Sequence, residues 1–328
     1  MQLISPMLAK AVETVPDTAG LLFEPKWDGF RAIVHVTADD VQIHGRSKPL
    51  TRYFPELVDA FTGMQPCVLD GEIVLRSGPA GNERLNWELL SQRIHPADSR
   101  VQKLAVETPA QFVAFDSLTD GFDVPFAERR AALEKLQLSP SIFRTQTTTD
   151  VDEARRWLVE FEGAGLDGVV AKPLDAVYAP GKRTMLKIKH HRTADVVLLG
   201  YRVHKSGVGV GSLLLGLHDT DGDLQNVGGV SAFSDKRRLE LVDELAPLVT
   251  GTGERERNRF TSGKDTSFVA LQPSRVLEVR YDQMEGSRFR HTVQFERWRP
   301  DREARSCTFE QLDRPIAYDL GEVLVRTE

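Results

Sequence analysis

The stretch EPKWDGFR, residues 24–31, decides how the rest of the sequence is interpreted. It follows the apolar run LLF and leads into FRAIVHVT (30–37), so it joins two segments with the composition of β-strands. Lys26 stands between a proline and a tryptophan, and an Asp-Gly pair follows. A solvated surface lysine needs none of these neighbours. The stretch therefore predicts an amine held at a rigid corner between a strand and a turn.

The length and composition indicate two domains that fold without disulfide bonds or a structural metal site. At 328 residues the chain exceeds the usual size of one hydrophobic core. Cys67 and Cys307 form no CxxC or Cys/His spacing, which argues against a disulfide framework and a structural zinc site and fits a reducing cytoplasm. No apolar run approaches the roughly 20 residues of a membrane span, and the first ten residues lack the features of a secretory signal. We therefore expect a cytoplasmic protein with no membrane association.

The charge distribution restricts how the chain can bind nucleic acid. The formal net charge is −6, so no long-range field attracts a polyanion and any binding depends on local clusters. KRTMLKIKHHR (182–192) contains no acid, and RFRHTVQFERWRPDREAR (288–305) is rich in arginine. Each cluster taken alone also fits an ordinary solvated face.

The first 190 residues mix strand-like and helix-like segments without a regular βαβ rhythm. Strands are predicted over 21–24, 30–37, 41–45, 67–76 and 111–118, with a hairpin between the second and third. Helices are predicted over 52–61 with Thr51 as N-cap, over 128–136, and over 151–163 with Asp150 as N-cap. This mixture predicts an α+β domain built on antiparallel sheets rather than a doubly wound fold.

The pattern of predicted secondary structure changes near residue 192. Short strand-like runs with Gly or Asp-Gly turns follow, interrupted by one helix over 234–249 with Ser234 as its N-cap. Five or so short strands and a helix in about 130 residues fit a small OB-like β-barrel. GVGVG (207–211) leads into a strand-like run rather than a helix, so we interpret it as a β-turn and not a dinucleotide-binding loop. The predicted domains are 1–192 and 193–328.

Lys26 needs help from other residues if it is a nucleophile. Free lysine has a pKa of about 10.4, so reaction near neutral pH requires a pKa lowered by about three units. A second cation close by has this effect. Lys187 and Lys189 are two residues apart on an apparent strand, so they project to one face and can supply both repulsion and charge for a phosphate. We therefore expect the strand of residues 185–189 to lie against the segment that holds Lys26.

Acidic residues next to glycine recur beside the β-rich runs, at Asp28-Gly29, Asp70-Gly71-Glu72 and Asp167-Gly168. Glycine lets a backbone or a ligand approach closely while the carboxylate points into a site. One Asp-Gly pair marks a tight turn far more often than an active site. Here three such acidic pairs lie in order between Lys26 and Lys187. This arrangement fits phosphoryl chemistry, which uses hard oxygen ligands for Mg²⁺ and acceptors for a ribose.

These motifs, in this order, resemble those of the covalent nucleotidyltransferases, which comprise ATP-dependent DNA ligases, RNA ligases and capping enzymes. Lys26-Trp27-Asp28-Gly29 with Arg31 is similar to the KxDGxR signature. The later motifs resemble the segments that contain Arg46, Asp70-Gly71-Glu72, Phe115-Asp116, 167–172, Lys187-x-Lys189 and 295–302. EPKWDGFRA, LTRYFPEL, LDGEIV, GLDGVVAKP and QFERWRPDR resemble the small actinobacterial ATP-dependent DNA ligases called ligase C. The resemblance implies an ATP-grasp-like nucleotidyltransferase domain followed by an OB-fold domain.

The resemblance also implies a reaction and a set of roles. ATP is the implied cofactor, with Mg²⁺ or Mn²⁺; Lys26 forms a lysyl-AMP, AMP moves to the 5′-phosphate of a DNA nick, and the 3′-hydroxyl displaces it. The implied roles are adenine recognition by Glu24 and stacking by Phe115, ribose and metal binding by Glu72, ribose or phosphate contacts by Arg31 and Arg46, α-phosphate binding by Lys187 and Lys189, metal binding by Asp167, and action on the leaving pyrophosphate by Arg299 with Asp301.

Two positions depart from the family pattern. Asp167 stands where the fourth motif usually has glutamate, so a bridging water would fill the shorter reach to a metal. Met185 stands where the fifth motif often has tryptophan, and a methionine can still line an adenine pocket. Phe115 has an alternative interpretation as a core residue.

The implied partner is nicked duplex DNA, held mainly through its phosphates and read with little sequence preference. We expect a monomer, and the resemblance suggests recruitment by a repair polymerase or primase. Two other functions stay open from the sequence. A capping guanylyltransferase or RNA ligase would share the chemistry of Lys26 with a different base or acceptor. A non-catalytic OB protein would bind nucleic acid without forming an adenylylated lysine.

Overall fold

The computed structural model describes residues 4–190, 192–254, 267–312 and 316–324, and the chain divides into two compact units. Unit 1 is Met1–Lys189 with Pro315–Glu328, and unit 2 is His190–Arg314. The first crossing between units lies close to the expected boundary at 192. The C-terminal segment, however, was expected in the second domain and belongs to unit 1, because its apolar residues Leu320, Val323 and Leu324 are buried in a core cluster of that unit.

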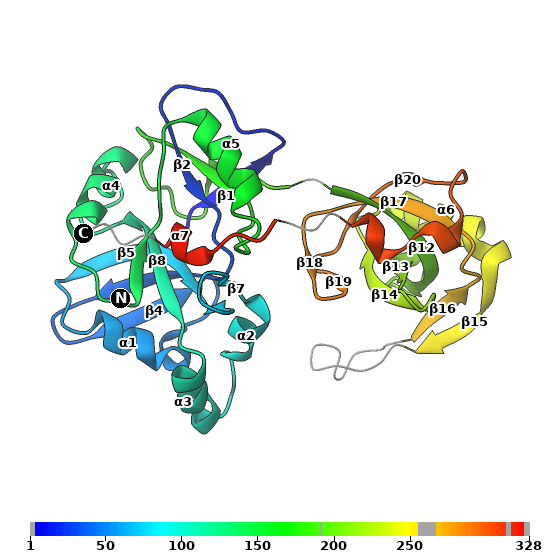
Figure 1. Ribbon diagram of the computed structural model, residues 1–328, viewed down its shortest axis with the longest axis horizontal. Helices are drawn as coiled ribbons and strands as arrows, with labels where there is room; N and C mark the ends of the chain where they lie inside the picture. Colours follow the sequence, from blue (N-terminus) through cyan, green and yellow to red (C-terminus); the bar gives the residue numbers. More distant parts are fainter. Residues whose placement is uncertain (1–3, 191, 255–266, 313–315, 325–328) are drawn as a thin grey trace. The chain divides into compact units, whose positions relative to one another are not determined.

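Two sheets form the frame of unit 1 (Figure 1). The five-stranded sheet has the order β4-β3-β5-β8-β9, with strands β3 (Phe30–Val36), β4 (Val41–Gly45), β5 (Cys67–Val74), β8 (Gln111–Ser117) and β9 (Ile142–Arg144). The four-stranded sheet has the order β1-β11-β10-β2, with β1 (Leu8–Val12), β2 (Leu21–Pro25), β10 (Val169–Pro173) and β11 (Arg183–Ile188). A separate small hairpin joins β6 (Arg76–Ser77) to β7 (Arg84–Leu85).

Most strand pairs in unit 1 are antiparallel, as expected, and the predicted hairpin of β3 and β4 is confirmed. Two pairs differ, because β1 with β11 and β8 with β9 are parallel. Parallel neighbours require a long crossover, and the chain between β8 and β9 contains the helix α4 (Phe126–Lys135).

The remaining helices of unit 1 are α1 (Pro55–Phe61), α2 (Trp87–Gln92), α3 (Asp98–Glu107), α5 (Val151–Glu160) and α7 (Leu320–Val323), with a 3-10 turn over Thr51–Tyr53. Asp150 caps α5 as predicted, since its side chain accepts from the backbone N–H of Asp152 and of Glu153. The prediction that Thr51 caps the next helix is wrong. The Thr51 hydroxyl instead accepts from Ile43 N at 2.9 Å, and the helix begins at Pro55, whose fixed φ suits a first turn.

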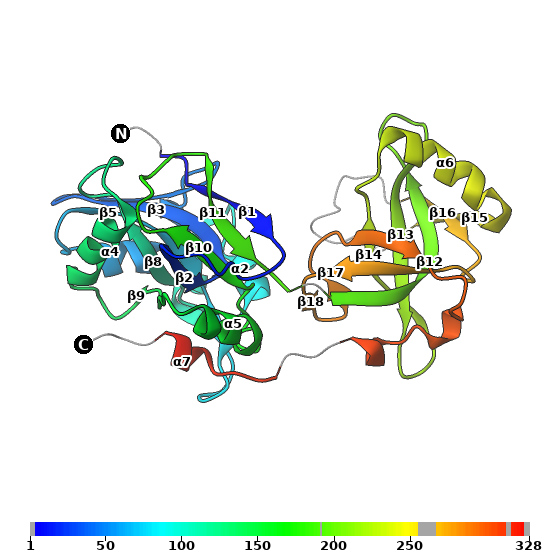
Figure 2. The same cartoon turned by 90° about the horizontal axis from the view of Figure 1, so that it is seen from above.

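The core of unit 1 lies on its sheets. One cluster packs α1 against the five-stranded sheet, with Phe61 and Phe112 among its fully buried rings. Another contains Trp27, Phe115 and Trp157 together with residues of α7. Both views show α7 beside α5, although the two helices are far apart in the sequence (Figures 1 and 2). The nucleophile candidate therefore lies next to a residue, Trp27, that is anchored in a core shared with the C-terminal segment.

Unit 2 is built on one seven-stranded antiparallel sheet with the path β14-β13-β12-β16-β15, to which β17 adds by pairing with β12 and β20. Its strands are β12 (Arg192–Val203), β13 (Val210–His218), β14 (Leu224–Val230), β15 (Val249–Glu254), β16 (Ser267–Leu271), β17 (Val276–Tyr281) and β20 (Gln294–Trp298), and a hairpin joins β18 (Met284–Glu285) to β19 (Arg288–Phe289). The pairings between described residues do not close this sheet into the ring expected of a barrel.

The helix of unit 2, α6 (Asp235–Leu245), packs on β13 and is visible beside the sheet in Figure 2. Ser234 caps it as predicted, since its side chain accepts from Arg237 N. Short 3-10 turns occupy Ala246–Leu248, Ala304–Ser306 and Phe309–Gln311. GVGVG connects β12 to β13, so its interpretation as a turn before a strand is confirmed. Within the parts of the chain that the structure describes, no helix combines the length and apolar character needed to cross a membrane.

Candidate active site

Lys26 is fixed at the end of β2 by both its backbone and its side chain. Its N–H donates to Gly168 O at 2.8 Å, and its carbonyl accepts from Asp167 N at 2.9 Å. Its Nζ lies 2.5 Å from Asp167 Oδ2, and Lys189 Nζ lies 2.9 Å from the same oxygen. The Asp167 side chain is 5% exposed, whereas that of Lys26 is 21% exposed. The structure thus places one buried carboxylate between two amines, one of which is the predicted nucleophile.

Glycine is needed at two points of this corner because backbones approach closely. A Cβ on Gly168, whose φ is +126°, would lie 2.0 Å from Ile188 O of β11. A Cβ on Gly29 would lie 2.0 Å from Ile73 O of β5. The sequence suggested that Gly29 makes room for the nucleotide. At both glycines, however, the group that approaches closely is the backbone of a neighbouring strand.

The expected approach of strand 185–189 to Lys26 occurs indirectly. β10 lies between β2 and β11 in the sheet, so the two segments do not pair. The contact runs through Asp167, which precedes β10 and binds both Lys26 and Lys189. Burial lowers the pKa of Lys187, and the charges of Lys189 and Lys26 lower it further. The three lysines therefore form one positively charged group.

Arg31 makes a bidentate pair with a buried acid. Its Nε and Nη2 donate to the two carboxylate oxygens of Asp70 at 2.6 and 2.7 Å. The Tyr178 hydroxyl donates to Asp70 Oδ2 at 2.6 Å and accepts from Met7 N at 3.3 Å. Sequence reasoning placed Arg31 on the ribose or phosphates and missed Tyr178. Tyr178 lies in the stretch DAVYAP, which matches no functional motif. Its hydrogen-bond partners are distant in the sequence, so no local pattern identified it as a site residue.

Glu72 lies opposite Arg31 in the pairing of β3 with β5. Its Oε1 accepts from Gly29 N at 3.1 Å. Burial raises the pKa of Glu72 to about 7, against the opposing charges of Arg31, Lys26 and Arg46. Arg46 itself is exposed on the loop after β4. Glu72 is therefore close to its protonation midpoint at neutral pH, beside the predicted nucleophile.

Glu24 and Phe115 both contact Lys172, a residue for which no role was predicted. Lys172 Nζ lies 2.6 Å from Glu24 Oε1 and 4.6 Å from the centroid of the Phe115 ring. The Arg31 guanidinium lies 4.3 Å from the same centroid. Phe115 is 4% exposed and belongs to a core cluster, which agrees with its alternative interpretation. Glu24 Oε2 is buried with no hydrogen-bond partner, so it is an acceptor without a donor.

Lys172 had a recognisable sequence feature. It is the one charge in the apolar strand VVAKP, and a lysine is almost never fully buried unless it is paired. Met185, by contrast, is 3% exposed and packs with Met7, Ile33, Leu118 and Tyr178, so it acts as a core residue.

Arg299 lies in unit 2 and is held by two acids. Its Nη1 donates to both carboxylate oxygens of Asp195, and its Nε and Nη2 donate to Asp301. Two other arginines of this stretch also lie beside acids, Arg297 at 2.6 Å from Glu278 and Arg302 at 3.6 Å from Asp195. The cluster at 288–305 is therefore less basic than its sequence suggests.

Comparison with known proteins decides the family. Residues 6–189 match the model of the ATP dependent DNA ligase domain, and residues 206–302 match that of the ATP dependent DNA ligase C terminal region. The chain belongs to the ATP-dependent DNA ligases. It is 53% identical to DNA ligase C1 of Mycolicibacterium smegmatis, over 98% of this chain and 97% of that protein. It is 51% identical to DNA ligase C of Mycobacterium tuberculosis, over 98% and 97% of the two chains.

These matches confirm the resemblance to the small actinobacterial ligases. A solved structure from a study of Lig E DNA ligases supports the fold. It is 17% identical, with a TM-score of 0.57 over 91% of this chain and 100% of that one. The two-part α+β architecture is therefore that of a ligase, with an OB-fold domain represented by unit 2.

The carboxylates of this ligase predicted to bind a metal are Asp167 and Glu72. No group of three or more His, Cys, Asp or Glu able to hold an ion occurs among the described residues. Mg²⁺ does not need one, because it is usually bound through one or two carboxylates with substrate phosphates and water. Both carboxylates act on Lys26, the first by direct pairing and the second through its charge. This donor set fits a magnesium ion shared with a nucleotide.

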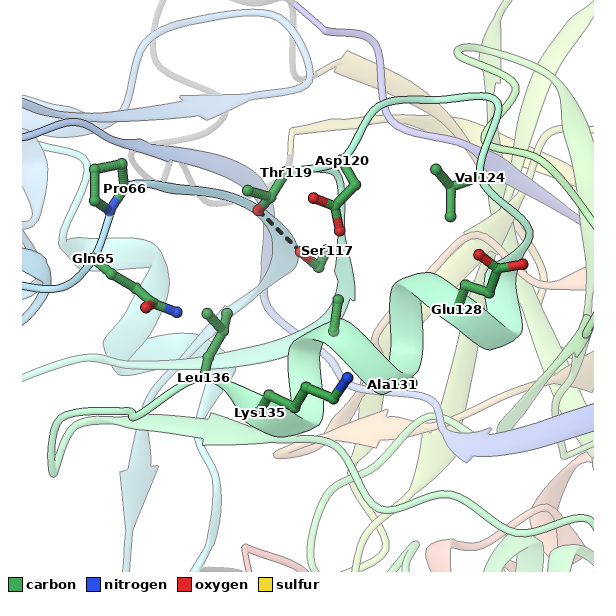
Figure 3. A pocket seen from close by; sticks show the side chains of 11 residues that line it. Gln65, Pro66, Ser117, Thr119, Asp120, Val124, Glu128, Ala131, Lys135 and Leu136 are labelled. Atoms are coloured by element: carbon green, nitrogen blue, oxygen red, sulfur yellow. Dashed lines mark hydrogen bonds between the residues drawn. The ribbon is translucent and has the colours of Figure 1, made fainter.

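A separate hollow of about 590 Å³ lies between α4 and the end of β8 in this ligase (Figure 3). Ser117 and Thr119 hydroxyls are 3.0 Å apart on one side, and Glu128 and Lys135 extend from α4 on the other. None of the predicted site residues lines it. The hollow is therefore distinct from the lysine cluster.

Proposed function

We propose that this ligase seals nicks in duplex DNA through a covalent lysyl-AMP on Lys26. The observation that carries the proposal is the arrangement of Lys26 and Lys189 on one oxygen of Asp167. Lys26 must lose a proton before it attacks, and Asp167 Oδ2, 2.5 Å away, is positioned to accept it. The amine then forms a bond to the α-phosphorus of ATP while the bond to pyrophosphate breaks.

The neighbouring residues have distinct tasks in this step. Lys187 and Lys189 neutralise the α-phosphate oxygens, since their charges already gather at the nucleophile. Glu24 Oε2 accepts from the adenine amino group, which gives this buried oxygen the partner it lacks. Arg31 and Arg46 contact the ribose or phosphates. Phe115 can stack on adenine only if Arg31 or Lys172 yields its place over the ring.

Asp167 and Glu72 would hold Mg²⁺, for which Mn²⁺ can substitute. The ion would supply positive charge to the phosphates as pyrophosphate leaves. Asp167 must release at least one of its two lysines to hold the ion, because both bind its Oδ2. Glu72 also hydrogen-bonds the ribose. The family resemblance gives Arg299 with Asp301 the task of acting on the departing pyrophosphate.

In the later steps AMP moves from Lys26 to the 5′-phosphate of the nick, and the 3′-hydroxyl attacks that phosphate and releases AMP. We propose that the enzyme binds nicked DNA as a monomer in the cytoplasm and acts in repair, recruited by a polymerase or primase. This setting rests on family resemblance. Pull-downs from cells that recover no repair protein would count against it.

The test of the chemistry is the intact mass of the protein. Incubation with ATP and Mg²⁺ should add the mass of one AMP, and pyrophosphate should remove it. Lys26→Ala should abolish the addition, whereas Lys103→Ala, at an exposed position on α3, should not change it. Absence of the adduct in the wild-type protein would refute the proposal.

The rival functions predict different products. A capping enzyme would take label from GTP, and an RNA ligase would pass AMP to RNA ends but not to nicked DNA. A non-catalytic OB protein would show no adduct and would bind DNA equally well after Lys26→Ala. We expect label from ATP alone and transfer to nicked DNA.

A further inference from the structure

The corner of the chain that carries Lys26 is fixed from two sides. On one side the backbone of Lys26 is hydrogen-bonded to Asp167 and Gly168, which lead into β10. On the other side the indole Nε1 of Trp27 donates to Thr145 Oγ1 at 2.8 Å. Trp27 is 5% exposed and belongs to a core cluster, whereas the Lys26 side chain is 21% exposed and contacts Asp167. Two successive residues thus place one side chain in the core and the other in the site.

Thr145 is itself held in place, directly after β9. It is 1% exposed, its N–H donates to Ala114 O of β8 at 2.9 Å, and its carbonyl accepts from Arg130 Nη2 of α4 at 3.0 Å. A β-branched side chain also has few χ1 rotamers, which fixes the hydroxyl relative to this backbone. The hydrogen bond between Trp27 and Thr145 therefore joins the Lys26 corner, at the end of β2 in the four-stranded sheet, to the edge of the five-stranded sheet.

The segment 145–148 has further attachments that keep the hydroxyl in place. Phe23 of β2 exchanges two backbone hydrogen bonds with Thr148, at 2.8 and 3.0 Å. The Gln146 side chain donates to two carbonyls of α7 at 2.9 and 3.0 Å. The segment therefore does not follow a displaced Trp27, and its hydroxyl is an acceptor of fixed position.

Loss of this acceptor would act on Lys26 through the chain. An indole N–H can only donate, and a buried donor without an acceptor is costly. The Trp27 ring would turn or shift toward another acceptor, and this would move the backbone of Lys26, one residue away. The nucleophile tolerates little movement, because a displacement of about 1 Å at a reacting group can slow a reaction about 100-fold.

We propose that Thr145 is a positioning residue for lysyl-AMP formation: its hydroxyl holds the Trp27 ring, and the ring holds the corner that presents the Lys26 amine. The inference rests on the proposed function, in which Lys26 is the nucleophile. Thr145 acts through Trp27 and not on the nucleotide. Its contribution belongs to the attack of Lys26 on ATP and not to the sealing of a nick that already carries AMP, because the 3′-hydroxyl is the nucleophile in that step.

The experiment separates these two steps in the full chain. Thr145→Val removes the hydroxyl at nearly constant shape. We expect the rate constant of lysyl-AMP formation at saturating ATP to fall by about 10-fold, with KM for ATP nearly unchanged. The intact mass at the end of the reaction should show the same fraction of adenylylated protein as in the wild type. Sealing of a pre-adenylylated nick should stay at the wild-type rate, and Thr145→Ser, which keeps the hydroxyl, should restore most of the lost rate.

Trp27→Phe tests the same hydrogen bond from the donor side, and it serves as the test if Thr145→Val does not fold. It should slow lysyl-AMP formation as well. The double variant should be no slower than Trp27→Phe alone, because the hydroxyl has no task once the indole N–H is gone. A double variant slowed by the product of the two single effects would show that the residues act independently, and the inference would fail.

Thr108→Val is the matched control. Thr108 ends α3, and its hydroxyl donates to Leu104 O at 3.1 Å, so the same change there should leave adenylylation unaltered. The inference is overturned if Thr145→Val forms lysyl-AMP at the wild-type rate, if Thr145→Ser is equally slow, or if both steps slow equally. A smaller final adduct with an unchanged rate constant would show partial unfolding alone and would overturn it too. A wild-type protein that forms no lysyl-AMP would overturn the proposed function instead.

Discussion

Lys172 and Glu24 form an ion pair that is almost completely removed from water, with side chains 4% and 5% exposed. Removal of one partner leaves the other charge buried and uncompensated. Lys172→Met should therefore lower the free energy of unfolding by about 3–5 kcal/mol, as measured in urea. The exposed pair of Lys103 and Glu107 provides the control, and Lys103→Met should change it by no more than about 0.5 kcal/mol. Equal effects at the two positions would contradict this account.

Glu72 makes stability depend on pH in a predictable direction. Burial raises its pKa from 4.5 in the unfolded chain to about 7, so the folded state binds the proton more tightly. This contribution is fully present below pH 4.5 and is lost as the pH rises through 7. Between these limits the wild type should lose about 3 kcal/mol relative to Glu72→Gln. Urea unfolding of both proteins across this range measures the difference, and parallel curves would exclude the assignment.

At the scale of elements, the C-terminal segment 316–324 behaves as part of unit 1. Leu320 N donates to Glu83 O at 2.8 Å, and Glu83 N donates to Asp319 Oδ1 at 2.8 Å. Gln146 Nε2 donates to Glu322 O and Val323 O at 2.9 and 3.0 Å. Leu320 and Val323 are fully buried. The segment thus binds the β6–β7 hairpin and the chain before α5 at the same time.

Gly163 gives a direct test of this docking. A Cβ on Gly163 would lie 1.9 Å from Ile316 O. The φ of Gly163 lies outside the left-handed region, so alanine is compatible with the local backbone and Gly163→Ala acts mainly on the docked segment. We expect a loss of about 1–3 kcal/mol in the free energy of unfolding and faster proteolysis near the C-terminus. Val159→Ala, at a 64% exposed position on α5, should change neither. Unchanged proteolysis of Gly163→Ala would show that the segment does not depend on this contact.

The sequence allowed prediction of local elements and motif order more completely than of long-range partners. The caps at Asp150 and Ser234 followed from residues within three positions of each other. The pairing of Lys172 with Glu24, or of Tyr178 with Asp70, depends on strands brought together by the whole fold. The segment 316–324 is short and weakly patterned, so its apolar residues acquire meaning only on the surface that receives them. The roles of the site residues came from the resemblance of motifs, because hydrophobic periodicity predicts helices and strands but not chemical function.

At the scale of the molecule, unit 2 is an insertion in the chain of unit 1. Its residues 190–314 leave unit 1 after Lys189 and return to it before the docked C-terminal segment. Unit 2 is therefore connected to unit 1 at both ends, and the docking of α7 closes the second connection.

The overall charge sets how the ligase should bind DNA. With a net charge of −6 and many arginines of unit 2 paired to acids, affinity must come from a few local phosphate contacts. Each contact should cost about 3.5-fold in affinity when salt rises fourfold. Arg46 is exposed and is one candidate contact, so Arg46→Ala should reduce the slope of log affinity against log salt by about 1 on any sequence. Fluorescence anisotropy with nicked duplexes measures this slope, and an unchanged slope would remove Arg46 from the DNA-binding surface.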